Sequence, residues 1–225
     1  MMSVTAVLEK NKMAFGNVIC LDRNLPFTIL DLTAGNRTLK DVDLSDPKAF
    51  ERFILAKIAE TSSAFAIGKY DEDRTIYDHS DVFCGENRRT IHLGIDLWVS
   101  AGNDVFAPLD GKVHSFNDNA ADGDYGPTII LQHELDGTTF FTLYGHLSRE
   151  SLNGLSKGQS ISKNQVIGHI GNYPENGNWP PHLHFQIIVA MLGKEGDFPG
   201  VTSEQDREKM LALCPDPNLI LCLSL

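Results

Sequence analysis

The stretch IHLGIDLWVSAGNDVFAPLDG, residues 91–111, sets the pattern of this chain, which is a series of short apolar runs ending at glycine or Asp-Gly. It carries His92 and Asp96, and two later pieces complete the group, Tyr144-Gly145-His146 and His182-Leu183-His184. Side chains repeat every second residue on an extended backbone. The first pair therefore shares one face of a strand, as do the two histidines of the last piece, and the two pairs can converge.

The five grouped residues suit a catalytic metal site. Two imidazoles and a carboxylate form a three-ligand zinc set that leaves a fourth position for water. Two histidines then remain, and proton transfer near neutral pH usually needs an imidazole. A lone histidine is more often a hydrogen-bonded structural residue, so we give that role to His79, His114 and His169. The grouped residues differ because each pair has even spacing in an apolar stretch beside glycine or proline.

The order of these pieces carries a family likeness. His92-x-x-x-Asp96, Tyr144-Gly145-His146-Leu147 and His182-Leu183-His184-Phe185 resemble the motifs of the lysostaphin-type zinc peptidases, and Asp124-Tyr125-Gly126 looks like the middle of that domain. The likeness covers roughly residues 85–189. It implies a compact antiparallel β-domain with a groove over one sheet. The combined motifs are specific, whereas His-x-His alone is weak.

The resemblance also implies roles for the residues of the site. One zinc ion per chain would be held by three ligands, His92, Asp96 and His184. His182 would act as the general base, and His146 would stabilise the oxyanion or share the proton transfer; which histidine does which is left open. Tyr144 and His133 match family positions as well, and we expect both to be structural.

The chain departs from the family before His182. The segment Asn172-Tyr-Pro-Glu-Asn-Gly-Asn-Trp-Pro-Pro181 is enlarged, and Trp179 predicts a narrower substrate channel, while Gln186 stands where the family often has an acidic residue. We expect hydrolysis of peptide amide bonds, with peptidoglycan cross-bridges as the family default. One alternative is an intracellular zinc hydrolase acting on a soluble peptide or amide. A non-catalytic binding module is a weaker alternative, because such a module should have lost ligands.

The fold predicted from the turn signals is mainly β, an antiparallel sandwich or partly closed sheet. Six strands are expected within a peptidase domain of residues 71–225, namely 91–99, 112–116, 128–133, 139–144, 165–170 and 182–189. That domain should end in a short helix between Ser203 and Pro215, followed by an apolar tail that packs on the body.

Residues 1–70 are expected to form a small α+β extension. Its strands are predicted at 17–21 and 26–32, and its helix is capped by Asp46 and started by Pro47. The helix has an apolar stripe of four residues, Phe50, Phe53, Ile54 and Ile58. The stripe is core, or it leans over the groove as an inhibitory or substrate-selecting cap. From Ala64 to Arg89 the chain is turn-rich, and Tyr70, Arg74 and Tyr77 there have no assigned role.

Composition and charge narrow the classes of partner. The chain has 225 residues, of which 42% are hydrophobic, and its net charge is −11. Residues 71–225 hold 10 basic against 22 acidic residues, so nucleic acid and anionic membrane are poor partners for this part. Only Val4 to Leu8 is apolar near the start, which predicts no signal peptide and a cytoplasmic location, with the cell envelope as the alternative. The four cysteines are expected to be reduced and mostly buried, and Cys84 is a remote candidate for the metal site.

Overall fold

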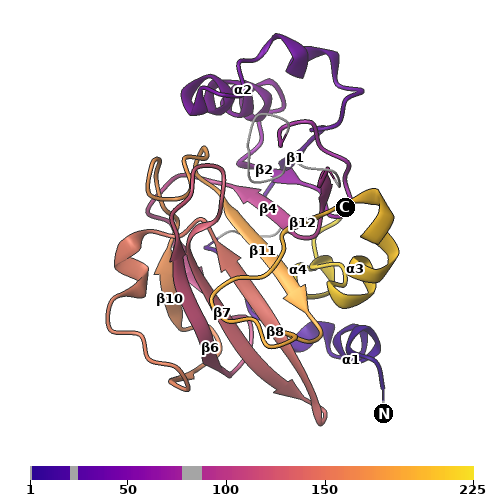
Figure 1. Ribbon diagram of the computed structural model, residues 1–225, viewed down its shortest axis with the longest axis vertical. Coiled ribbons are helices and arrows are strands. Elements are labelled where there is room, and N and C mark those ends of the chain that lie inside the picture. The colour runs from indigo at the N-terminus through magenta and orange to yellow at the C-terminus, as the bar shows by residue number, and fades with distance from the viewer. Residues whose placement is uncertain (1, 21–24, 78–87) are drawn as a thin grey trace.

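The computed structural model describes residues 2–20, 25–77 and 88–225, and its centre is one eight-stranded sheet (Figure 1). The order of strands in space is β1-β2-β4-β11-β8-β7-β6-β9. The strands of this sheet are β1 Phe27–Leu30, β2 Phe65–Gly68, β4 Ile95–Trp98, β6 Gly111–Asn119, β7 Gly126–Leu135, β8 Thr138–Gly145, β9 Ser160–Ile161 and β11 Leu183–Ile188. Two small pairs stand beside it, formed by β3 Ile91–His92 with β12 Val201–Thr202 and by β5 Asp104–Phe106 with β10 Val166–His169.

The described helices are short and lie around the sheet. They are α1 Val4–Lys10, α2 Pro47–Glu60, α3 Arg207–Leu213 and α4 Asn218–Leu221, with 3-10 turns at Lys12–Ala14, Arg37–Asp41, Arg149–Leu152 and Glu204–Asp206. Figure 1 shows α2 at the end formed by β1 and β2, which it contacts, while α1 lies beside α4 and β8. The prediction of a mainly β fold is confirmed.

Two details differ from the expected sheet. The predicted strand 91–99 is two strands, β3 and β4, because the ladder breaks at Leu93-Gly94. A Cβ on Gly94 would lie 2.5 Å from the His184 ring, so the break leaves room for that imidazole. The second difference is that β1 pairs with β2 in parallel, whereas the other pairings are antiparallel.

The β7–β8 hairpin shows how the local sequence sets the register. Leu135 pairs with Thr138, and the two-residue loop Asp136-Gly137 has φ values of 51° and 72°. Positive φ at both positions is what a type I′ turn requires, and Asp-Gly is a preferred pair for it. This turn aligns Ile129 with Tyr144, and so carries β8 to the sheet centre.

The central strands alternate between an apolar face and a polar one. In β4, Ile95 and Leu97 enter the main hydrophobic core, while Asp96 and Trp98 face the other way. In β11, the core takes Leu183, Phe185 and Ile187, and the opposite face carries His184 and Gln186. Since Asp96 pairs with His184 across neighbouring strands, the period-2 pattern brings the polar groups together.

The N-terminal part extends the same sheet. β2 pairs with β4, and Ala66 lies opposite Trp98. The helix α2 begins as predicted, because the Asp46 side chain accepts a hydrogen bond from the Lys48 amide and Pro47 occupies the first turn. Its residues Phe50 and Ile54 are buried in a second hydrophobic cluster with Trp98. The division of the chain at residue 70 stays a prediction.

The C-terminal tail packs on the body as expected, with Ile220 and Leu221 buried in the main core. Of the described cysteines, Cys214 is buried and free, but Cys20 is exposed, contrary to the expectation of mostly buried thiols. The positions of His79 and Cys84 lie outside the described residues. No helix within residues 2–20, 25–77 and 88–225 has the length and apolar character needed to cross a membrane.

Candidate metal centre

Three buried side chains converge at the junction of β3, β4 and β11. His92 Nε2 lies 3.0 Å from His184 Nδ1, and Asp96 Oδ1 lies 3.3 Å and 3.2 Å from these two nitrogens. Four-coordinate zinc binds nitrogen and oxygen at about 2.0–2.1 Å, which places tetrahedral donor atoms about 3.3 Å apart. The spacing of the three donor atoms therefore fits a zinc ion.

Hydrogen bonds on the far side of each imidazole fix the tautomer that a metal requires. His92 Nδ1 donates to the carbonyl of Lys69 at 2.8 Å, which leaves Nε2 with its lone pair. His184 Nε2 donates to Gln186 Oε1 at 2.9 Å, which leaves Nδ1 free, and the Gln186 amide is itself anchored to the carbonyl of Pro199. Such outer contacts orient metal ligands and set their basicity. The sequence had marked Gln186 only as a departure from the family pattern.

His146 and His182 lie beside this triad, with ring centroids 4.2 Å apart. Each donates its Nδ1 proton to a main-chain carbonyl, His146 to Asn176 at 2.8 Å and His182 to Pro180 at 2.7 Å. Their Nε2 atoms are thus the proton acceptors. Burial lowers the pKa of His182 to about 4, and burial followed by repulsion from His182 and His184 holds the pKa of His146 well below its usual range. Both rings are neutral bases at neutral pH.

The backbone at His146 is held in a demanding conformation. Its φ of 61° lies in the left-handed region, which non-glycine residues seldom adopt. Its amide donates to the carbonyl of Tyr125, and its carbonyl accepts from the amide of Gly171. Backbone strain of this kind persists where the surroundings over-determine it, and it clusters at functional sites.

Aromatic side chains support and wall the site. Trp98 stacks on His182 with centroids 4.0 Å apart and an interplanar angle of 24°, and Phe50 of α2 meets Trp98 edge-on at 5.5 Å. Tyr125 places its hydroxyl 3.4 Å from His184 Nε2. The sequence had connected Tyr125 only with the family likeness, because nothing local marks a tyrosine whose neighbours come from distant strands.

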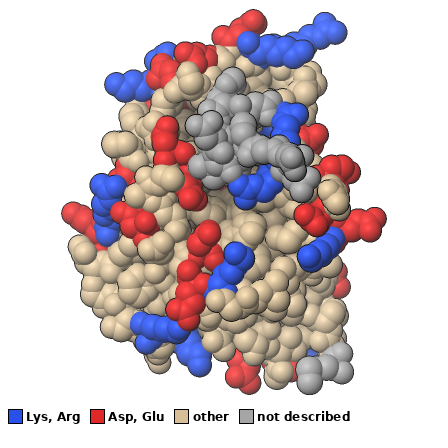
Figure 2. Space-filling view, viewed as in Figure 1, with Lys and Arg blue, Asp and Glu red and all other residues tan. Residues whose placement is uncertain are grey.

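Four of the five residues, Asp96, His146, His182 and His184, line a pocket of about 300 Å³. Its aromatic wall includes Tyr77, Trp98, Tyr125 and Trp179, and its charged lining includes Arg89, Asp124, Lys194 and Asp197. On the face drawn in Figure 2, acidic and basic side chains are interspersed and no broad basic patch is formed.

The structure brings together the five residues that the sequence grouped, and their contacts do not include the described histidines held to be structural, His114, His133 and His169. His133 Nδ1 donates to the carbonyl of Asp110, and its Nε2 contacts the Thr142 hydroxyl in a buried network that also includes Tyr144. His114 contacts Ser115 and Phe141, and His169 pairs with Asp104 at the surface.

Comparison with known proteins agrees with this geometry. Residues 90–196 match the model of peptidase family M23. These residues form a peptidase M23 domain. A protein named an uncharacterized metalloprotease, from Haemophilus influenzae, is 35% identical over 98 residues, which are 44% of this chain and 18% of that relative. The chain thus spans about a fifth of the length of the curated relative it matches. The lysostaphin-type likeness inferred from the motifs is confirmed.

Solved structures of the family share similarity with this chain. The catalytic domain of lysostaphin from Staphylococcus simulans is 26% identical, with coverage of 53% of this chain and 80% of that domain and a TM-score of 0.38. A zinc-containing peptidase from Vibrio cholerae is also 26% identical. The match covers 44% of this chain and 28% of that peptidase, with a TM-score of 0.35.

Proposed function

We propose that this M23 domain is a zinc-dependent metallopeptidase that hydrolyses peptide amide bonds. The observation that carries the proposal is the convergence of three donor atoms, His92 Nε2, Asp96 Oδ1 and His184 Nδ1, at 3.0–3.3 Å. The N–H protons of the two imidazoles point away from this site, toward Lys69 and Gln186, so the nitrogen lone pairs and the Asp96 oxygen face one point. We expect these residues to hold one zinc ion per chain, and zinc bound there would supply an activated water and a Lewis acid for the carbonyl.

The remaining two histidines handle protons in this proposal. His182 and His146 present unprotonated Nε2 atoms to the pocket, since each Nδ1 donates to a carbonyl. His182 also lies 3.9 Å from Asp96 Oδ1, so we assign the general base to His182. His146 is placed to share the proton transfer, or to stabilise the oxyanion after its Nε2 has taken up a proton.

The substrate proposed is a peptide that can enter a small pocket. A volume of about 300 Å³ is at the lower end of the range for ligand sites. The family's peptidoglycan cross-bridges are one source of such a bond and a soluble peptide is the other, and the aromatic wall around Trp179 favours the soluble peptide. Cytoplasmic location remains a prediction.

The test measures metal and turnover in the same preparations. The purified chain is expected to contain about one zinc per chain by elemental analysis, and to release new amine termini from a peptide mixture. His92→Ala, Asp96→Ala and His184→Ala should each lose most of the zinc and the activity. His169→Ala is the matched control, because its surface ion pair with Asp104 lies outside the pocket lining. Equal zinc content in the three variants and the control would overturn the proposal.

A further inference from the structure

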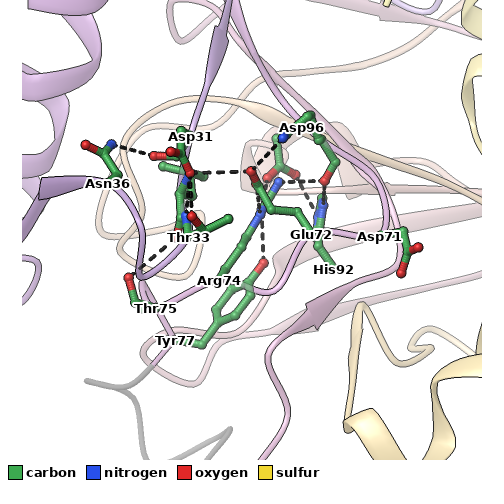
Figure 3. Close-up of polar contacts among 12 residues, drawn as sticks. Asp31, Thr33, Asn36, Asp71, Glu72, Arg74, Thr75, Tyr77, His92 and Asp96 are labelled. Atoms are coloured by element: carbon green, nitrogen blue, oxygen red, sulfur yellow. Dashed lines mark hydrogen bonds and ion pairs between the residues drawn. The ribbon is translucent and has the colours of Figure 1, made fainter.

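Arg74 is the largest side chain that is fully buried among the described residues, and the proposed chemistry does not use it. Its Nη1 donates to Asp96 Oδ2 at 2.6 Å, its Nε donates to Glu72 Oε2 at 3.0 Å, and its Nη2 donates to the carbonyl of Lys69 at 3.0 Å (Figure 3). A buried guanidinium is costly unless it is paired and hydrogen-bonded. Its position against Asp96 therefore calls for an explanation.

The contact with Arg74 divides the two oxygens of Asp96. Oδ2 is occupied by the guanidinium, and Oδ1 faces His92 Nε2 and His184 Nδ1. A free carboxylate has two oxygens that can bind one ion together, which raises the coordination number. Held in this rotation, Asp96 offers one oxygen only, as a three-ligand zinc site with an open position requires.

Backbone pairing with β3 also fixes the position of Arg74. Residues 71–74 run antiparallel to β3, since the Arg74 amide donates to Thr90 and the His92 amide donates to Glu72. Side chains two apart on this extended segment share a face, which puts Glu72 beside Arg74. The space over Gly68 is filled by the guanidinium, because a Cβ there would lie 2.6 Å from Arg74 Nη2.

Residues of the N-terminal part hold this segment from the other side. The Leu32 amide donates to Glu72 Oε1 at 3.4 Å, and its carbonyl accepts from the Thr75 amide at 3.1 Å. Arg74 lies between two carboxylates, those of Glu72 and Asp96, and Glu72 also pairs with Lys69 Nζ at 3.5 Å. A continuous set of contacts thus connects Leu32 to Asp96.

We propose that Arg74 is a positioning residue that restricts Asp96 to one metal-facing oxygen, and that the N-terminal part secures it through Glu72. The inference rests on the proposed zinc site and adds a determinant of metal affinity and coordination number to it. It also gives residues around 32 a role in building the site.

The test compares Arg74→Met, Arg74→Lys and Tyr77→Phe with the wild type. Zinc affinity is measured by competition with a chromophoric chelator, and coordination number by the visible absorption of the cobalt-substituted protein, which is most intense for four ligands. Arg74→Met should weaken zinc binding by about 10- to 100-fold and reduce the cobalt absorption. Arg74→Lys keeps the charge but not the planar fork, so it should restore affinity in part and leave the cobalt absorption reduced.

Tyr77→Phe is the matched control. It removes the hydroxyl that accepts from Arg74 Nη1 at 3.1 Å but leaves the contact with Asp96, so affinity and spectrum should match the wild type. If Arg74→Met does not fold, as judged by circular dichroism, Arg74→Lys decides by itself. Wild-type affinity and spectrum in Arg74→Lys would overturn the inference, and so would wild-type values in Arg74→Met. A wild type that binds no zinc would instead overturn the proposed function, and this inference with it.

Discussion

At the scale of single residues, the hydrogen bond that each imidazole donates decides which of its nitrogens keeps a lone pair. Three histidines donate Nδ1 to main-chain carbonyls, namely His92 to Lys69, His146 to Asn176 and His182 to Pro180. The fourth, His184, is reversed and donates Nε2 to Gln186. Each of the four rings therefore keeps one nitrogen lone pair at the site, and burial keeps the rings of His92, His146 and His182 neutral.

A prediction follows for the two histidines outside the metal triad. His182→Ala and His146→Ala should keep most of the zinc, because neither supplies a converging donor atom. Loss of proton transfer should lower turnover by about 100-fold or more. Steady-state kinetics on a short peptide, with zinc content measured in parallel, checks this. Unchanged turnover in both variants would remove the roles assigned to them.

Residue types and spacing grouped the five residues that the structure brings together, since each lies in a short motif. Their roles as metal ligands and proton carriers stay predictions. The residues that support the site could not be predicted from the sequence. Gln186 and Arg74 act through contacts with Pro199 and Asp96, and Tyr125 reaches His184 across 59 positions of sequence. Contacts of that kind depend on how the strands are ordered in space, which spacing along the chain does not encode.

At the scale of elements, the strands with turn signals on both sides were predictable, whereas β2, which lies between β1 and β4, was not. The predicted strands 128–133 and 139–144 appear as β7 and β8, each longer by a few residues. β2 was missed because its four residues, Phe-Ala-Ile-Gly, are buried on both faces and show no alternation. The predicted strand at 17–21 reduces, in its described part, to a bridge between Ile19 and Val105.

The stripe on α2 gives a prediction about stability. Phe50 is buried against Trp98, which stacks on His182, so Phe50→Ala opens a cavity behind the site. We expect the free energy of unfolding to fall by about 3–5 kcal/mol, as measured by urea denaturation. Leu55→Ala on the same helix is the control, since Leu55 is 56% exposed and its truncation should change stability by no more than about 0.5 kcal/mol. Equal losses in both variants would contradict the packing described for α2.

At the scale of the whole molecule, the N-terminal part extends the sheet of the M23 domain and packs behind its site. β1 and β2 extend the sheet beyond β4, and α2 covers Trp98. The pocket is bounded on this side by Tyr77 and Trp98 and on the other by the enlarged loop that ends at Trp179. The walls of the pocket on these two sides therefore come from residues outside the short motifs that carry the family likeness.

The substrate can be tested through that loop. Trp179 meets Tyr77 edge-on at 6.2 Å and His146 at 6.4 Å, so its ring restricts the space beside His146. Wild-type enzyme should release amine termini from soluble peptides, including wall-derived ones, and act poorly on intact peptidoglycan, which is bulky and anionic while this chain carries a net charge of −11. Trp179→Ala should widen the pocket and raise activity on intact peptidoglycan relative to peptides. Efficient release from intact peptidoglycan by the wild type would show that the aromatic wall does not exclude the polymer, and the family's default substrate would then replace the soluble peptide.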